Sequence, residues 1–407
     1  MNQETQTNPS FQRDRFFTVT LVMFALSFQA TSNSAIALFL PMIRQELGLN
    51  FTAGGILSAA SMFIYTLMQV PSGYLSDRFG ARKVFLIGLF GTTILCFLLG
   101  LINAYWQAIA NQAASGIFRA LLFAPGIALL AGWFASERRA TAMGLSLAGM
   151  MSGQVVLNGV GPIIESFYNW RIPFLVFASV GIMTSITYLF WGKGAPDMMR
   201  RSKIDLRYAL MLFRHKAMWI CGGIQYVRLA LHQGITFWLP SLLIEEKGLA
   251  LQVTGLIIAL RSLVIIPSNI LGAYISDRLQ KPALLINISL LMLAVTTALI
   301  VRVEDTALVI LLVIVNSIFV QLYFGPLFAI PVDIFGKEMT GTLTGFGNFI
   351  GNIGSFTIIS LLGLLKDLSG TFKSGFYTLT GLCLVGIIFT LMLEQNRKAS
   401  IAKPKVE

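Results

Sequence analysis

Charged residues are scarce in this chain of 407 residues, since Asp, Glu, Lys and Arg together make up only 12% of it. A soluble globular domain contains about 25% charged residues, because its surface faces water. Apolar residues reach 56% and the mean hydropathy is +0.75. The scarcity of charge therefore excludes a soluble enzyme of two or three domains, a disordered chain and a small disulfide-linked scaffold.

The residues that build catalytic and metal sites are also scarce. The three cysteines, Cys96, Cys221 and Cys383, lie inside apolar stretches without CxxC spacing, and the two histidines, His215 and His232, lie on different segments. No Ser/His/Asp set, phosphate-binding loop or metal-ligand cluster stands out in the sequence. We therefore expect the protein not to be an enzyme and to hold neither a cofactor nor a metal.

The chain has a series of long apolar runs instead. A helix needs about 20 residues to cross the roughly 30 Å hydrocarbon core of a bilayer, where each backbone polar group must be paired within its own segment. We predict an all-α membrane protein with twelve transmembrane helices. The predicted spans cover residues 16–42, 52–76, 84–103, 106–134, 140–165, 172–193, 217–243, 251–276, 283–302, 307–334, 340–365 and 374–394.

Basic residues are distributed unevenly over the loops between these spans. If the N-terminus is cytoplasmic, 21 of the 30 Lys and Arg residues fall on the cytoplasmic side and six on the other, as the positive-inside rule requires. Both termini are therefore predicted to lie in the cytoplasm, with the protein in a plasma or bacterial inner membrane. The first run is interpreted as a retained helix rather than a signal peptide. The net charge of +12 is spread between apolar spans, so nucleic acid is not an expected partner.

The most basic stretch, residues 194–216, separates six spans from six. We predict an N-terminal six-helix bundle over residues 1–193 and a C-terminal one over residues 217–407. The stretch between them is interpreted as a cytoplasmic linker that lies on anionic headgroups, with a regulatory binding site as the alternative. Since one chain of this kind can enclose its own site, we expect a monomer whose partners are a small solute and membrane lipid.

The two halves of the sequence repeat. The second span ends in the sequence Gly-Tyr-Leu-Ser-Asp-Arg at residues 73–78, and the eighth ends in Ala-Tyr-Ile-Ser-Asp-Arg at residues 273–278. The offset is 200 residues, and four of the six positions are identical. Repeated six-helix halves are typical of pseudo-symmetric transporters whose site lies between the halves.

The loop at residues 73–83 resembles the signature G-x-L-x-D-R-x-G-R-[KR] of the major facilitator superfamily, with Ala81 at one basic position. This resemblance, which leans to the branch of organic-anion and anion–cation symporters, implies that the loop closes the inner side by holding the two halves together. A carboxylate at Asp77 could bind the positive N-terminus of a neighbouring helix, whereas the alternative is a plain turn rich in positive charge. The gating residues implied by the resemblance are Gly73, Asp77, Arg78, Gly80, Arg82, Lys83, Asp277 and Arg278.

Three arginines, Arg119, Arg228 and Arg261, fall in the middle of predicted spans, whereas no acidic residue does. A charge at the bilayer centre costs about 2.5–3.5 kcal/mol on insertion scales, so these arginines should face a cavity or a partner. A planar guanidinium binds carboxylate or phosphate through two parallel hydrogen bonds. We therefore predict an anionic solute, with a structural role for each arginine as the alternative.

Arginines at similar positions in the superfamily occur in members that carry organic anions, phosphate esters or nitrate. The nitrate branch usually places one arginine in each half, and the counterpart of Arg261 in the first half is Ser61. Nitrate is therefore the less favoured anion. Other polar residues predicted to line the solute site are His232, which could carry a coupling proton, and three pairs of amides at helical spacing, Gln29 with Asn33, Gln154 with Asn158, and Asn348 with Asn352.

The sequence thus predicts a secondary active transporter that moves a small organic anion, a carboxylate or a phosphate ester, by alternating access. The energy would come from proton symport or from exchange for a second anion. The alternative function is an exporter of amphipathic or drug-like compounds in the same fold, for which Arg228 and Arg261 would be dispensable.

Overall fold

The computed structural model of the chain describes residues 9–134, 139–194, 216–325, 327 and 340–401. These residues form twelve α-helices and one short π-helix, and no strand occurs among them. The helices are α2 (Pro9–Leu47), α3 (Phe51–Phe79), α4 (Ala81–Leu99), α5 (Tyr105–Gly132), α6 (Arg139–Phe167), α7 (Arg171–Trp191), α9 (Lys216–Ser241), α10 (Leu251–Leu279), α11 (Pro282–Arg302), α12 (Thr306–Leu322), α14 (Thr340–Ser369) and α15 (Lys373–Ile401).

Each of the twelve predicted spans coincides with one of these helices, so the predicted all-α fold is confirmed. Within the described residues, nine helices are long and apolar enough to cross a membrane. The tenth span was predicted over residues 307–334; α12 ends at Leu322, Tyr323 has left helical geometry, and residues 328–334 lie outside the described residues. The sequence places Pro326 four residues after Leu322, and a proline has no N–H to bond the Leu322 carbonyl. The predicted linker lies almost wholly outside the described residues.

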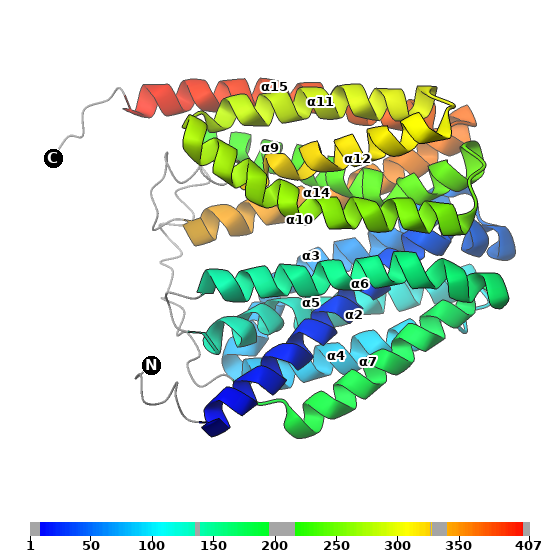
Figure 1. Ribbon diagram of the computed structural model, residues 1–407, viewed down its shortest axis with the longest axis vertical. Coiled ribbons are helices and arrows are strands. Elements are labelled where there is room, and N and C mark those ends of the chain that lie inside the picture. Colours follow the sequence, from blue (N-terminus) through cyan, green and yellow to red (C-terminus); the bar gives the residue numbers. More distant parts are fainter. Residues whose placement is uncertain (1–8, 135–138, 195–215, 326, 328–339, 402–407) are drawn as a thin grey trace. The chain divides into compact units, whose positions relative to one another are not determined.

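The chain forms two compact units. Unit 1 comprises residues 1–49, 56–201 and 250–259, and unit 2 comprises residues 50–55, 202–249 and 260–407. In unit 1, α2 packs against α6 and α7, and α4 packs against α5 and α7. In unit 2, α9 packs against α14 and α15, and α11 packs against α15 and α12; α11 and α15 run side by side in Figure 1. Each unit therefore buries its own set of helix faces.

Backbone geometry repeats with the same offset of 200 residues as the sequence. Gly48 (φ 62°) and Gly248 (φ 67°) end the helical segments that precede α3 and α10. Gly80 (φ 88°) and Gln280 (φ 53°) follow the ends of the same two helices. Since positive φ is rare outside glycine, four such residues at matching positions show that the two halves share a helix–turn–helix framework.

Residues 50–55, at the start of α3, belong to unit 2, and residues 250–259, at the start of α10, belong to unit 1. In unit 2, a Cβ at Gly55 would meet the Ile359 carbonyl of α14 at 2.8 Å; in unit 1, a Cβ at Gly255 would meet the Asn158 carbonyl of α6 at 2.3 Å. Both positions therefore require glycine for close helix approach. Gly55 and Gly255 are 200 residues apart, so this close approach occurs at matching positions of the internal repeat.

Candidate functional site

Unit 1 holds one deep arginine, Arg119 of α5, whose side chain is 7% exposed. Its Nη1 donates to the Ser61 hydroxyl of α3 at 2.7 Å, and its guanidinium carbon lies 5.9 Å from the centre of the Tyr65 ring. The Gln29 amide of α2 donates to the Arg119 carbonyl at 3.2 Å. Within the described part of the chain, Nε of Arg119 has no hydrogen-bond partner. Among the described residues, the groups of α2 and α3 that contact Arg119 in these ways are all neutral.

Unit 2 holds the other two. Arg228 of α9 is 7% exposed, and its Nε donates to the Gln225 side-chain oxygen at 2.8 Å. Its guanidinium carbon lies 4.9 Å from the centre of the Phe324 ring. Stacking on an aromatic face leaves the in-plane N–H groups of a guanidinium directed outward from its rim.

Arg261 of α10 is 3% exposed and is held from one side. Its Nη1 donates to the Thr236 hydroxyl of α9 at 3.0 Å, and that hydroxyl in turn donates to the His232 carbonyl at 2.5 Å. Nε and Nη2 of Arg261 are buried and have no hydrogen-bond partner among the residues that the structure describes. These two atoms form the edge of a guanidinium that binds a carboxylate through two parallel bonds.

The internal repeat links the arginines of the two units. Ser61, which accepts the hydrogen bond from Arg119, is the residue 200 positions before Arg261. Unit 1 therefore brings a guanidinium from α5 to the point of α3 that corresponds to Arg261 on α10. The sequence shows only that Ser61 stands where the repeat has Arg261. Its contact with Arg119 could not be predicted, because the two residues are 58 positions apart and lie on different helices.

The three predicted pairs of amides differ in their burial and in their hydrogen-bond partners. Gln29 is brought to Arg119, and Asn33 lies one turn further along α2 and is partly exposed. Asn158 donates to the Gln154 backbone carbonyl of its own helix at 2.7 Å. Asn348 and Asn352 lie one turn apart on α14, the first partly exposed and the second buried. Thr236 was missed by the sequence analysis, since a threonine in a helix is too common to single out.

Comparison with known proteins identifies the family. The sequence model of the Major Facilitator Superfamily matches residues 22–359. The chain belongs to the major facilitator superfamily. It is an integral, multi-pass membrane protein and a solute transporter of that superfamily, not an enzyme, as the sequence predicted.

Relatives in the superfamily span nearly the whole chain. The D-galactonate transporter of Escherichia coli O6:H1 is 21% identical over 94% of this chain and 96% of its own. The hexuronate transporter of Bacillus subtilis is 21% identical over 91% of this chain and 93% of its own. A solved bacterial homologue of the human lysosomal transporter Spinster, inward-facing and occupied, has a TM-score of 0.75 at 14% identity and covers 95% of this chain and 97% of its own. That last likeness shows the shared fold.

The superfamily loop at residues 73–83 joins α3 to α4. Gly80 is the N-cap of α4 with φ 88° and ψ 135°, a conformation that glycine adopts readily. The Arg78 Nη1 donates to the Tyr74 hydroxyl at 3.3 Å, and the Arg82 Nη2 donates to the Leu189 carbonyl of α7 at 3.2 Å. Asp77 is exposed, as are Lys83 and, in the second copy, Asp277 and Arg278.

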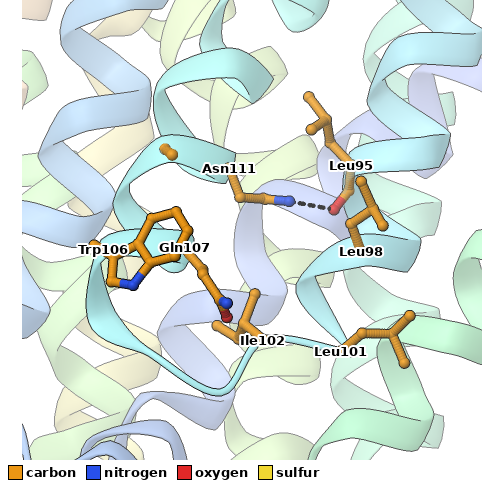
Figure 2. Close-up of a pocket in the computed structure, with 8 residues that line it drawn as sticks. Leu95, Leu98, Leu101, Ile102, Trp106, Gln107 and Asn111 are labelled. Atoms are coloured by element: carbon orange, nitrogen blue, oxygen red, sulfur yellow. Dashed lines mark hydrogen bonds between the residues drawn. The ribbon is translucent and has the colours of Figure 1, made fainter.

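A groove of about 440 Å³ lies between α4 and α5 of unit 1. Figure 2 shows Leu95, Leu98 and Trp106 around it, with the Asn111 amide donating to the Leu95 carbonyl at 2.9 Å. Its lining is apolar apart from two amides, and it includes none of the three deep arginines. The groove is therefore separate from the anion-binding candidates.

Proposed function

We propose that the protein carries a small organic anion, a carboxylate or a phosphate ester, across the membrane by alternating access. The observation that carries the proposal is the edge of Arg261, where two buried N–H groups have no partner among the described residues. A buried charge without a partner is strongly destabilising, and a bidentate anion would satisfy both donors at once. The galactonate and hexuronate transporters to which the chain is similar are named for carboxylates, which favours a carboxylate.

We assign the solute site to Arg119, Arg228 and Arg261, with His232 and the predicted amides around them. The proposed moving parts are an N-terminal bundle of residues 1–193 and a C-terminal bundle of residues 217–407. The positive-inside count supports two cytoplasmic termini. The chain would act as a monomer in contact with lipid, with the basic linker on the cytoplasmic headgroups.

Replacement of Arg261 tests the proposal. In full-length protein purified in detergent, Arg261→Gln should weaken the binding of galactonate at least about 10-fold, because glutamine removes the charge and the paired donors. Arg261→Lys should also weaken it, since an ammonium keeps the charge but not the planar pair. Arg302→Gln is the matched control, since Arg302 is exposed and bonds the Tyr377 hydroxyl.

If the protein is instead an exporter of amphipathic compounds, galactonate should not bind. Arg228→Gln and Arg261→Gln should then leave the transport of amphipathic compounds unchanged. A screen of small carboxylates, phosphate esters and amphipathic cations by thermal shift would separate the two functions.

The energy source is a separate question, to be tested in liposomes. Uptake that rises with an inward proton gradient indicates symport, whereas uptake that rises with an internal anion indicates exchange. Uptake that responds to neither would exclude both forms of coupling.

A further inference from the structure

Thr236 of α9 makes two hydrogen bonds that fix the direction of its hydroxyl group. Arginine side chains carry donors only, so in the 3.0 Å contact with Nη1 of Arg261 the hydroxyl oxygen accepts. The single hydrogen of the hydroxyl is donated to the backbone carbonyl of His232, one turn earlier on the same helix, at 2.5 Å. Since its hydrogen is already used, the hydroxyl can meet Arg261 only as an acceptor.

This contact leaves one edge of the Arg261 guanidinium open. Nη1 is held by Thr236, whereas Nε and Nη2 are buried without a hydrogen-bond partner in the described ranges. The guanidinium is planar and rigid, so a bond that holds Nη1 from a neighbouring helix also restricts where the edge of Nε and Nη2 lies. That edge has the paired N–H geometry that a carboxylate matches.

A similar arrangement occurs in unit 1. Nη1 of Arg119 donates to the hydroxyl of Ser61 on another helix at 2.7 Å, and Nε of Arg119 is buried and unpaired among the residues that the structure describes. Arg228 differs, since its Nε donates to Gln225 of its own helix. Two of the three deep arginines therefore have Nη1 held by a hydroxyl of a neighbouring helix while Nε stays open, one in each unit.

We propose that Thr236 is a positioning residue for the solute, which holds Arg261 in the orientation that presents Nε and Nη2 to a carboxylate. The inference rests on the proposed function, in which Arg261 binds that carboxylate. A long side chain that is ordered only when a ligand binds lowers the affinity, and one that is already ordered does not. Without the Thr236 hydroxyl, the solute should therefore bind about 3- to 10-fold more weakly.

Two substitutions separate the hydroxyl of Thr236 from its methyl group. Thr236→Val keeps the shape but removes the hydroxyl, whereas Thr236→Ser keeps the hydroxyl and removes the methyl. The dissociation constant of galactonate is measured on full-length protein in detergent. Valine should weaken binding about 3- to 10-fold, and serine should bind within about twofold of the wild type. Thr390→Val is the matched control and should bind as the wild type does, since Thr390 is a buried threonine of α15 whose hydroxyl donates to the Gly386 carbonyl of its own helix at 2.8 Å.

Uptake of galactonate into liposomes gives a second measurement. Thr236→Val should raise KM by the same factor and leave kcat within about twofold of the wild type, because positioning acts through the binding of the solute. A threonine that only packs α9 against α10 gives the reverse order of the variants. Valine would then fill the space as threonine does, and serine would leave a gap that lowers the thermal midpoint of the protein without ligand.

The outcomes distinguish this inference from the proposed function. Wild-type affinity in Thr236→Val, or a greater loss of affinity in Thr236→Ser than in Thr236→Val, would overturn the role of Thr236. If Arg261→Gln still weakens binding in that case, the carboxylate assignment of Arg261 stands without it. Wild-type protein that does not bind galactonate, or Arg261→Gln that binds it as the wild type does, would overturn both.

Discussion

Each deep arginine is anchored by a neutral acceptor. Ser61 binds Arg119, the Gln225 amide binds Arg228, and Thr236 binds Arg261. A hydroxyl or amide fixes the direction of a guanidinium without cancelling its charge, whereas a carboxylate would do both. The residues around the arginines thus fix the orientation of each guanidinium and leave its positive charge in place.

Gly80, at the turn between α3 and α4, has a backbone angle that strains any residue with a Cβ. A Cβ at this position would meet no atom within 4 Å, yet φ is 88°. Gly80→Ala should therefore destabilise the protein by about 1–3 kcal/mol through backbone strain alone. The measurement is the thermal unfolding midpoint in detergent. Gly159→Ala is the matched control, because Gly159 also has open space but lies within a helix, and its midpoint should not fall. Equal midpoints for the two variants would contradict the strain argument.

At the scale of elements, the start of α3 is held both by its own Asn50, which accepts from the Ala53 N–H at 2.8 Å, and by a residue of another helix. The Asp367 carboxylate of α14 accepts from the backbone N–H groups of Phe51 at 2.9 Å and Thr52 at 2.7 Å, and from the Thr52 hydroxyl at 2.5 Å. A carboxylate at a helix N-terminus satisfies free donors and complements the helix dipole. Asp367 thus binds residues 50–55, at the start of α3, within unit 2.

Asp367→Ala should lower the free energy of unfolding by about 0.5–1.5 kcal/mol, because the Phe51 and Thr52 N–H groups lose their shared acceptor. Asp367→Asn should cost less, because an amide oxygen still accepts hydrogen bonds. Thermal unfolding of the purified protein measures both, with the exposed Glu304→Gln as the control. A midpoint for Asp367→Ala that equals that of the control would show that the cap contributes nothing.

The elements that follow from local rules could be predicted from the sequence, and those that depend on distant partners could not. Helices such as α3 and α10 were predicted within three residues at each end, because lipid forces every apolar run to pair its backbone internally. The arginines stood out because charge in an apolar run is rare. The Ser61–Arg119 bond, the Thr236 anchor and the Asp367 cap each join separate helices or depend on side-chain geometry, which no periodicity encodes.

At the scale of the whole molecule, the repeat explains why corresponding helix ends behave alike. Both α3 and α10 begin after a glycine with positive φ and end before a residue with positive φ. The first residues of both helices are also grouped differently from the rest of the helix, since residues 50–55 belong to unit 2 and residues 250–259 to unit 1.

The loop at residues 73–83, which carries the superfamily signature, offers a test of how the whole molecule closes. Asp77 is exposed at the last turns of α3, and we propose that its charge closes the inner side of the transporter, as the signature motif implies. Asp77→Asn keeps the shape of the side chain but would remove the charge-assisted hydrogen bond that the proposed closure requires, and such a bond is worth about 1.5–3 kcal/mol. The closed state should then be populated about 10- to 100-fold less, and uptake of the anion into liposomes should slow accordingly, while the amount of folded protein stays the same. Asp277→Asn, in the degenerate second copy, is the matched control and should slow uptake less. Wild-type uptake by Asp77→Asn would remove the latch role, and the loop would then be a turn whose positive charge only orients the protein in the membrane.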